Sequence, residues 1–509
     1  MKKIMALVLC LCFALGGCAQ GETIPHTGGG VKPEPSPAPM EETAEMNESK
    51  TDVDYEKLAL ALAKLPELPE EPDMQAFDDA MEALDYSALG AEGYQQASEA
   101  LWNEYSEKRN AYYDAVQSLR GDGVDAMTSG AFSAYTLRAA QQLMAGETEQ
   151  NVVWSPANLC LALCMLAEAT DGASRSQILD LLGLSSVEQA RAAANALWRN
   201  LYSDGAADKT LLANSLWLNE QFTYHEDTVD TLANDYYASA FRAPMGDKST
   251  DAAIHEWINE NTNHLLEDAA NGIETKDETL MMLISTLYFK GTWQKQFNSY
   301  DTREDVFTSS DGTEQKIDFM HTTERGAYYR LGSYTVAPLR FRDGKTMWFL
   351  LPDEGVNLDD VWSLTWNLPM TAVTTSEGCY ETPAFELLAQ QSTGEIHWSV
   401  PKFDVDSDLD LIPALEAMGV TDVFDDQLAD FSPLTDLDAL VSAVEHAARV
   451  KVNEEGCEAA AFTAIMAEAT SAMIEPLPIV EMNLNRPFGF LITGVNGLPL
   501  FMGTVNTVE

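Results

Sequence analysis

Basic residues are scarce in this chain, which has 30 Lys and Arg against 81 Asp and Glu among 509 residues and a formal net charge of −51. A surface with this charge repels nucleic acid and anionic lipid headgroups, so we exclude nucleic-acid binding. Two interpretations of the charge stay open. It keeps a secreted protein soluble, or it attracts cationic proteins.

Cysteine and histidine are also scarce, with seven of each. Their spacing includes neither a CxxC pair nor a Cys/His cluster suited to a metal. Cys160 and Cys164 lie four residues apart in an apolar run and share one face of a predicted buried helix. We therefore expect no disulfide framework, no structural metal and no cofactor.

An apolar run from Ile4 to Leu15 follows two lysines and is too short to cross a bilayer as a stable helix. It predicts a signal peptide over residues 1–18. The sequence Leu-Gly-Gly-Cys ending at Cys18 matches the bacterial lipobox, in which this Cys is diacylated; ordinary signal cleavage is the alternative. Because two acyl chains anchor a soluble domain, we expect an extracytoplasmic protein, lipid-anchored to the bacterial cell membrane or surface.

Two segments of unusual composition follow the leader. Residues 19–51 are rich in Pro, Gly, Glu and Thr, which predicts an extended linker. Residues 52–121 carry apolar residues at helical spacing among many acids, which predicts an acidic helical extension of two or three helices. Leu58, Leu60 and Leu62 belong to the first of these helices. Packing on the main domain, partner binding and a stalk are all compatible with this pattern.

The remaining residues, 122–509, have a mixed pattern. Helical spacing covers 133–145, 159–168 and 186–201. Strand patterns dominate later, at 283–290, 346–351, 397–403, 449–452 and 499–505. We expect an α+β fold with mixed β-sheets and a bundle of helices.

Nine short motifs in this domain resemble, in the same order, those of the serpin family of serine protease inhibitors. The motifs are Asn151–Pro156 (NVVWSP), Leu212–Leu218 (LANSLWL), Leu287–Trp293 (LYFKGTW) with Phe297, Val400–Phe403 (VPKF), Leu415–Phe424 (LEAMGVTDVF), Ala429–Ser432 (ADFS), His446–Gly456 (HAARVKVNEEG), Asn485–Phe488 (NRPF) and Leu500–Gly503 (LFMG). The resemblance implies a serpin fold with an exposed reactive-centre loop. It also implies a monomeric inhibitor rather than an enzyme, and the leader makes it a bacterial lipoprotein member.

A serpin presents its loop as a substrate, and the protease forms an acyl-enzyme on it. The cleaved loop then enters the central sheet as a new strand and carries the protease with it. The resemblance places the loop hinge at Glu454, Glu455, Gly456, Cys457, Glu458, Ala459, Ala460 and Ala461.

Insertion requires small residues on the inward face of the loop, and side chains alternate faces along a strand. The face that begins at Cys457 is uncharged and lacks proline, and only Ile465 on it is large; it comprises Cys457, Ala459, Ala461, Thr463, Ile465, Ala467 and Ala469. The opposite face takes Glu458, Phe462, Met466 and Glu468. This alternation is typical of a loop that inserts.

Cys457 departs from the family pattern, because inhibitory members usually have Thr or Ser at this position. Cys is similar in size, so insertion should survive the replacement. We expect its thiol to lie in an exposed loop, where oxidation to a sulfinate would oppose burial.

The family's usual count from the first hinge glutamate predicts cleavage between Thr470 and Ser471. Because the segment after Ser471 is longer than usual, Met473–Ile474 is the alternative bond. The neighbouring residues are small or medium in size and include no Arg or Lys. A shallow apolar specificity pocket would bind them, so we expect an elastase-like or subtilisin-like serine protease, held covalently through Thr470.

By resemblance, four polar residues hold the central sheet closed until insertion: Ser155, Asn158, Ser285 and His446. Trp293 marks the point where the loop enters. Compared with the family pattern, the Ser and Asn of the second and third positions are exchanged.

A non-inhibitory serpin used as a cell-surface binding module is the alternative function. Its acidic helices would be the working part, but the small inward face of the loop favours inhibition. An enzyme is disfavoured because the sequence contains no GxSxG, HExxH, P-loop or GxGxxG motif.

Overall fold

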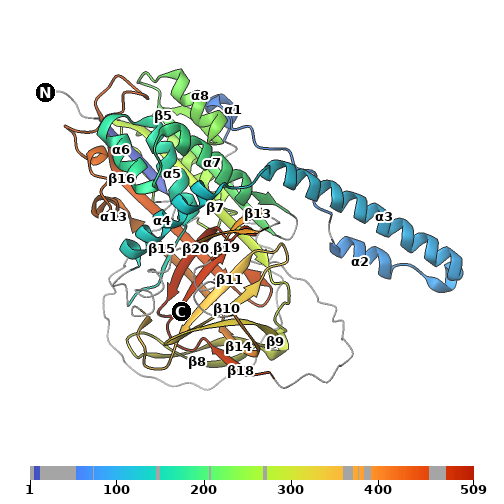
Figure 1. The fold of residues 1–509 in the computed structure, drawn as a ribbon. Helices are drawn as coiled ribbons and strands as arrows, with labels where there is room; N and C mark the ends of the chain where they lie inside the picture. Colours follow the sequence, from blue (N-terminus) through green and yellow to red (C-terminus); the bar gives the residue numbers. More distant parts are fainter. Residues whose placement is uncertain are drawn as a thin grey trace, which may run out of the picture.

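The computed structural model describes residues 5–11, 53–72, 74–144, 149–205, 208–266, 272–358, 371–375, 378–382, 391–457 and 477–508. Two nine-stranded sheets form the frame of the molecule, and most helices lie against the central sheet (Figure 1). The prediction of an α+β fold with mixed sheets is confirmed.

The central sheet has the strand order β1-β16-β17-β7-β5-β6-β2, with β15 paired to β16 and β4 paired to β5. Its strands are β1 (Met5–Leu11), β2 (Ala59–Ala61), β4 (Ser203–Asp204), β5 (Lys209–Asn219), β6 (Ala238–Ala243), β7 (Thr279–Thr292), β15 (Phe403–Asp410), β16 (Ala439–Val452) and β17 (Gly456–Cys457). The longest strands of this sheet, β7 and β16, flank the two-residue strand β17.

The second sheet has the order β18-β14-β9-β10-β11-β19-β20-β3, with β8 paired to β9. Its strands are β3 (Val152–Trp154), β8 (Arg303–Thr308), β9 (Glu314–Leu331), β10 (Tyr334–Arg340), β11 (Thr346–Pro352), β14 (Ser392–Pro401), β18 (Ile479–Asn483), β19 (Phe488–Thr493) and β20 (Pro499–Val505). A separate hairpin consists of β12 (Thr371–Thr375) and β13 (Gly378–Thr382).

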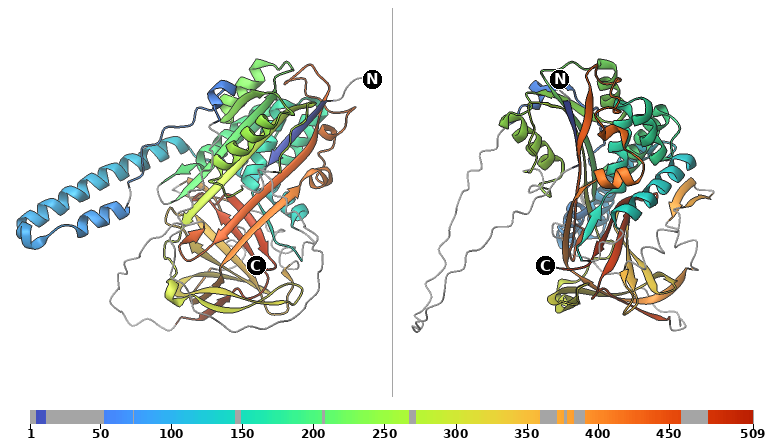
Figure 2. Two further views of the ribbon diagram at one scale, coloured as in Figure 1. Left: turned by 180° about the vertical axis from the view of Figure 1, so that it is seen from behind. Right: turned by 90° about the vertical axis from the view of Figure 1, so that its left-hand side faces the viewer.

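Helices cover both faces of the central sheet. Helices α5, α6 and α7 lie on one face and α9 lies on the other (Figure 2). The helices of the main domain are α4 (Ala126–Leu143), α5 (Pro156–Ala169), α6 (Gly172–Leu182), α7 (Val187–Leu201), α8 (Glu226–Asp235), α9 (Lys248–Asn261) and α13 (Ile412–Ala417), with 3₁₀ turns η1 (Ser299–Asp301) and η2 (Asp422–Phe424). Among the described residues, we find no helix with both the length and the hydrophobicity needed to cross a membrane.

Helix α5 lies at the centre of the fold. Every one of its residues is buried, including Cys160 and Cys164, as the apolar run predicted. Pro156 stands at the first helical position, where its missing N–H costs nothing, and the Ser155 hydroxyl caps the helix by accepting from the Asn158 amide at 3.2 Å. Because this helix packs against β7, its first turn reaches the centre of the sheet.

The strand patterns of the main domain are confirmed, but the first helix predicted in the extension is wrong. Only one helical turn forms there, α1 (Tyr55–Leu58), and β2 follows it directly. Strand β2 pairs antiparallel with β6 at the edge of the central sheet. The spacing of Leu58, Leu60 and Leu62 is compatible with a strand, in which alternate residues share a face, as well as with a helix. Pairing with β6 at the edge of the sheet selects the strand for residues 59–61.

The other predicted helices of the extension form a hairpin, which we call the arm: α2 (Met74–Glu82) and α3 (Tyr86–Arg120). The arm stands away from the two sheets (Figures 1 and 2). Its base is fixed because Arg199 Nε donates to the Leu119 carbonyl at 2.6 Å and the side chains of Tyr112 and Val116 are buried. Gly90, with a φ of 68°, interrupts α3 near its beginning.

The N-terminal strand β1 lies between β16 and β7 and runs parallel to both. It belongs to the segment that the sequence predicts as a leader, and removal of the residues before Cys18 stays a prediction. Cleavage before Cys18 would remove β1 and leave this strand position vacant in the mature chain.

Candidate functional site

Several predicted site residues lie outside the described residues. They are the two candidate bonds, Thr470–Ser471 and Met473–Ile474, the hinge residues Glu458, Ala459, Ala460 and Ala461, and the lipidation residue Cys18. The beginning of the hinge and the whole predicted polar cluster are described, and they define the candidate site.

The hinge begins inside the central sheet. Strand β17 is antiparallel to both of its neighbours: Cys457 pairs with Val452 of β16 and with Gly291 of β7, and Gly456 pairs with Thr292. A Cβ atom on Gly456 would lie 2.0 Å from the Gly291 carbonyl oxygen. Only glycine therefore fits here, and the first residues of a new strand are already in place.

A tight turn joins β16 to β17. The Asn453 side-chain oxygen accepts from the amides of Glu455 (2.9 Å) and Gly456 (3.2 Å), and the Asn453 amide donates to the Gly456 carbonyl at 3.0 Å. Sequence reasoning missed Asn453. The signal was present, since Asn followed by a Gly within three residues is typical of a side-chain-stabilised turn.

Trp293 holds this turn from the β7 side. Its amide donates to the Glu455 carbonyl at 2.9 Å and its indole Nε1 donates to the Asn453 carbonyl at 3.0 Å. The indole ring stacks on Phe341 with 4.6 Å between ring centroids. Trp293 thus lies at the hinge, where the resemblance places the entering loop.

Asp208 is a second residue that sequence reasoning missed at the hinge. Its carboxylate accepts from the Thr292 amide at 2.6 Å, beside the Gly456 pairing. Burial, reinforced by the nearby negative charge of Asp343, raises the pKa of Asp208 to about 6. Nothing in the local sequence distinguished this Asp from the many others.

The expectation that the Cys457 thiol lies in an exposed loop is wrong. Its side chain is 3% exposed and belongs to the main hydrophobic core, so the thiol does not lie in an exposed loop. The reason is that β17 is inserted between β16 and β7, which buries the first hinge residues. The inward direction of Cys457 also fixes which face of the following residues would turn to the core.

The four polar residues predicted to close the sheet form one buried network. His446 Nε2 accepts from the Ser155 amide at 2.9 Å, and the Asn158 side chain donates to the Ser285 carbonyl at 3.1 Å. The Ser285 hydroxyl donates to the side-chain oxygen of Asn214 at 2.8 Å. This network joins α5 to β5, β7 and β16, and Asn214 is a member that the sequence did not reveal.

The network leaves two polar atoms unsatisfied. Within the described part of the chain, His446 Nδ1 and Asn158 Oδ1 are buried without a hydrogen-bond partner. Each buried, unpaired polar atom costs about 1–3 kcal/mol. The arrangement seen here is therefore not the most favourable one for these two side chains.

His446 is completely buried, and burial lowers its pKa to about 4. The imidazole is therefore neutral at pH 7, with Nε2 free to accept from Ser155. Protonation would convert that acceptor into a donor facing another donor and would break the link between β16 and α5.

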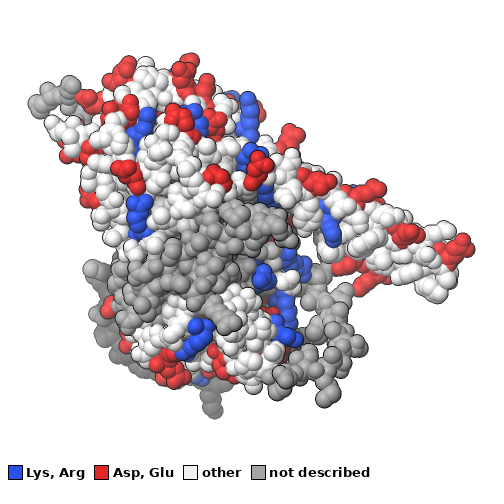
Figure 3. All heavy atoms as spheres, in the orientation of Figure 1, with Lys and Arg blue, Asp and Glu red and all other residues white. Residues whose placement is uncertain are grey.

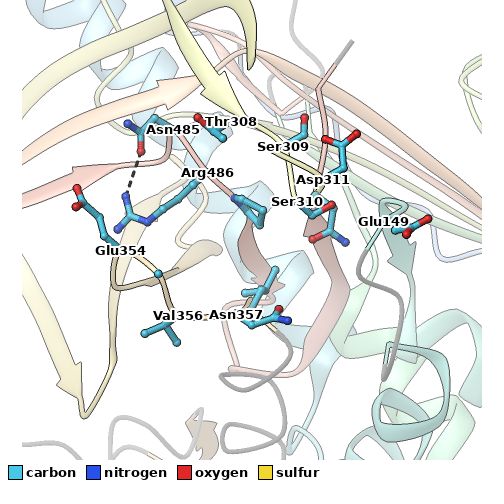
Figure 4. A pocket seen from close by; sticks show the side chains of 14 residues that line it. Glu149, Thr308, Ser309, Ser310, Asp311, Glu354, Val356, Asn357, Asn485 and Arg486 are labelled. Atoms are coloured by element: carbon cyan, nitrogen blue, oxygen red, sulfur yellow. Dashed lines mark hydrogen bonds between the residues drawn. The ribbon is translucent and has the colours of Figure 1, made fainter. Parts of the chain in front are cut away.

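A polar cavity of about 650 Å³ lies elsewhere, between the ends of β8 and β11 and the segment before β19 (Figure 4). Arg486 from the Asn-Arg-Pro-Phe motif lines it. This guanidinium donates to the Pro352 carbonyl from Nη2 (2.6 Å) and to the Asn485 side chain (3.1 Å). These contacts connect β11 to the segment before β19, which gives Arg486 a structural role.

Comparison with known proteins places this geometry in a family. The family model "Serpin (serine protease inhibitor)" matches residues 131–508. Serpin-ZX of Arabidopsis thaliana is 26% identical over 70% of this chain and 91% of its own, and neuroserpin of Mus musculus is 28% identical over 71% and 87%. The native structure of tengpin, a thermophilic serpin, superposes with a TM-score of 0.64 at 25% identity and covers 76% of this chain and 95% of tengpin. The chain therefore belongs to the serpin family.

Proposed function

We propose that this protein inhibits elastase-like or subtilisin-like serine proteases by a suicide-substrate trap. Serpins are generally protease inhibitors rather than enzymes. One observation carries the proposal for this chain: β17 already occupies the first two positions of an additional strand between β16 and β7. Later positions of that strand are taken by β1, so the loop that follows would continue there once cleavage before Cys18 has removed the leader.

The energetics follow from the same observation. Each further residue added after Cys457 forms ladder hydrogen bonds and buries side chains between two long strands. A strand rises about 3.3 Å per residue, so about fifteen inserted residues span roughly 50 Å. This distance is sufficient to carry an acylated protease along the sheet and distort its active site before it can hydrolyse the ester.

The target class rests on the residues around the predicted bond. Ala469, Thr470 and Ala472 suit a shallow apolar specificity pocket. The acidic pocket of a protease specific for Arg or Lys would have no basic side chain to bind here. Elastase-like and subtilisin-like proteases have pockets of the first kind.

We expect the chain beginning just after Cys18 to form a covalent complex with pancreatic elastase or subtilisin. Denaturing gels should show a band of the summed mass, less the small peptide released, and mass spectrometry should find that peptide beginning at Ser471. A peptide beginning at Ile474 would keep the mechanism and move the bond. A trypsin-like protease is the control and should form much less complex.

Clean cleavage by all three proteases, without a covalent band, would contradict the trap. That result would support the non-inhibitory binding module instead.

We propose further that the inhibitor lies on the outer side of a bacterial membrane, anchored through a diacylated Cys18. We expect the full chain, produced in a bacterial host, to incorporate radiolabelled fatty acid and to sediment with membranes. A Cys18→Ala variant should incorporate none. Equal labelling of both proteins would contradict the anchor.

A further inference from the structure

None of the hinge or polar-network residues described above lies in the arm, and the arm's helical hairpin contains a groove. The groove has a volume of about 560 Å³ and is lined by the Pro69–Pro72 segment, α2 and α3. Its apolar floor includes Phe77, Leu101 and Tyr105. The rings of Phe77 and Tyr105 pack against each other with 4.7 Å between their centroids, which joins α2 to α3 at the floor.

Carboxylates stand at the rim of this groove. Glu70, Glu71 and Glu104 line it, and the lining also includes one cation, Lys108, which is paired with Glu104 at 2.8 Å. Trp102, two residues before Glu104, does not line the groove, but it is 51% exposed and packs on the lining residue Phe77 with 5.7 Å between ring centroids. The groove therefore combines an aromatic surface with negative charge.

The charge of the whole arm restricts what can bind there. Residues 74–120 contain nine Asp and Glu against three Lys and Arg, and acidic side chains occur along the arm to its tip (Figure 3). A second copy of this chain, nucleic acid and an anionic membrane would all be repelled. A cationic protein surface is the complementary partner.

We propose that the groove is a docking site for a Lys- or Arg-bearing surface segment of the protease that the loop captures; this inference rests on the proposed function. The cationic head of such a side chain would meet Glu70 and compete with Lys108 for Glu104, and its aliphatic stem would lie on Phe77 and Leu101. Since the loop itself carries no basic residue at the predicted bond, the arm adds a preference for cationic proteases that the loop cannot express.

The test compares two double variants of equal charge. Glu70→Lys/Glu104→Lys reverses two rim residues of the groove, and Glu92→Lys/Glu99→Lys reverses two exposed residues of α3 that do not line it. Both change the net charge by the same amount. The probe is a cationic elastase-type protease, used active for the rate of covalent trapping and with its nucleophilic serine replaced by alanine for equilibrium binding.

We expect the rim variant to bind the inactive protease about tenfold more weakly and to be trapped by the active one more slowly by a similar factor, whereas the α3 control should lose about twofold. An equal loss of affinity in both variants would show that the effect is long-range electrostatic steering, and it would contradict docking in the groove. No loss in either would also overturn it. Absence of covalent complex with normal binding would instead count against the trap, so the two proposals fail separately.

Discussion

An Ala461→Arg variant is expected to be cleaved at the normal rate but to trap almost no protease. Cys457 points into the hydrophobic core, and side chains alternate along a strand, so the side chain at 461 would enter the same core as the loop inserts. Burying an unpaired guanidinium costs several kcal/mol. If about 3 kcal/mol of this cost appears in the insertion barrier, insertion slows by roughly 100-fold. Hydrolysis of the acyl-enzyme is then faster than insertion, and the protease is released active.

Ala460→Arg is the matched control, because residue 460 shares the outward face of Glu458 and Phe462. This variant should keep its covalent complex. The measurement is the number of inhibitor molecules consumed per protease inactivated, read with densitometry of the cleaved and complexed bands. Similar behaviour of the two variants would show that the loop does not enter the sheet with the predicted alternation.

The second large effect is expected at acid pH, and it comes from His446. Its pKa is about 4 in the folded protein and about 6.5 in an unfolded chain, so the unfolded state binds more protons between these values. The stabilising contribution of the neutral imidazole is complete above pH 6.5 and is lost as the pH falls toward 4. The loss amounts to about 3 kcal/mol by pH 4.

Many acidic groups titrate in the same range, so the comparison must be with a variant. His446→Gln keeps an acceptor near the Ser155 amide but does not titrate. Between pH 7 and pH 4, the urea midpoint of the wild type should fall further than that of the variant. Parallel declines would show that His446 does not carry the acid sensitivity of the sheet.

The sequence predicted the fold well because serpin motifs combine local patterns with fixed order. Leu287–Trp293 and His446–Gly456 identify two strands and the residues that connect them to the hinge. Hydrogen-bond partners supplied by distant backbone were much harder to foresee. Asn214 joins the buried network because β5 lies beside β7, and Asp208 meets Thr292 for the same reason. Asn214 lies within the Leu212–Leu218 motif, but the motif does not reveal its partner, and no local pattern marks Asp208.

Two errors have one physical cause, which is competition between local preference and an available sheet position. Residues 58–62 fit a helix, but helix α1 ends at Leu58 and the edge of β6 pairs with Ala59–Ala61 as a strand. The glutamates before Cys457 suggest an exposed position, but pairing with β16 on one side and β7 on the other buries Cys457 in the core. In both cases a distant strand, invisible in the local sequence, determines the conformation.

Because Cys457 is buried, its chemical modification can report how often the hinge strand β17 opens. A water-soluble alkylating reagent reaches this sulfur only during intervals when β17 has separated from β16 and β7. At high reagent concentration, the modification rate equals the frequency of those separations, whatever their duration. The alkylation rate of this one side chain would thus measure the rate constant for opening of the sheet, which a static structure does not show.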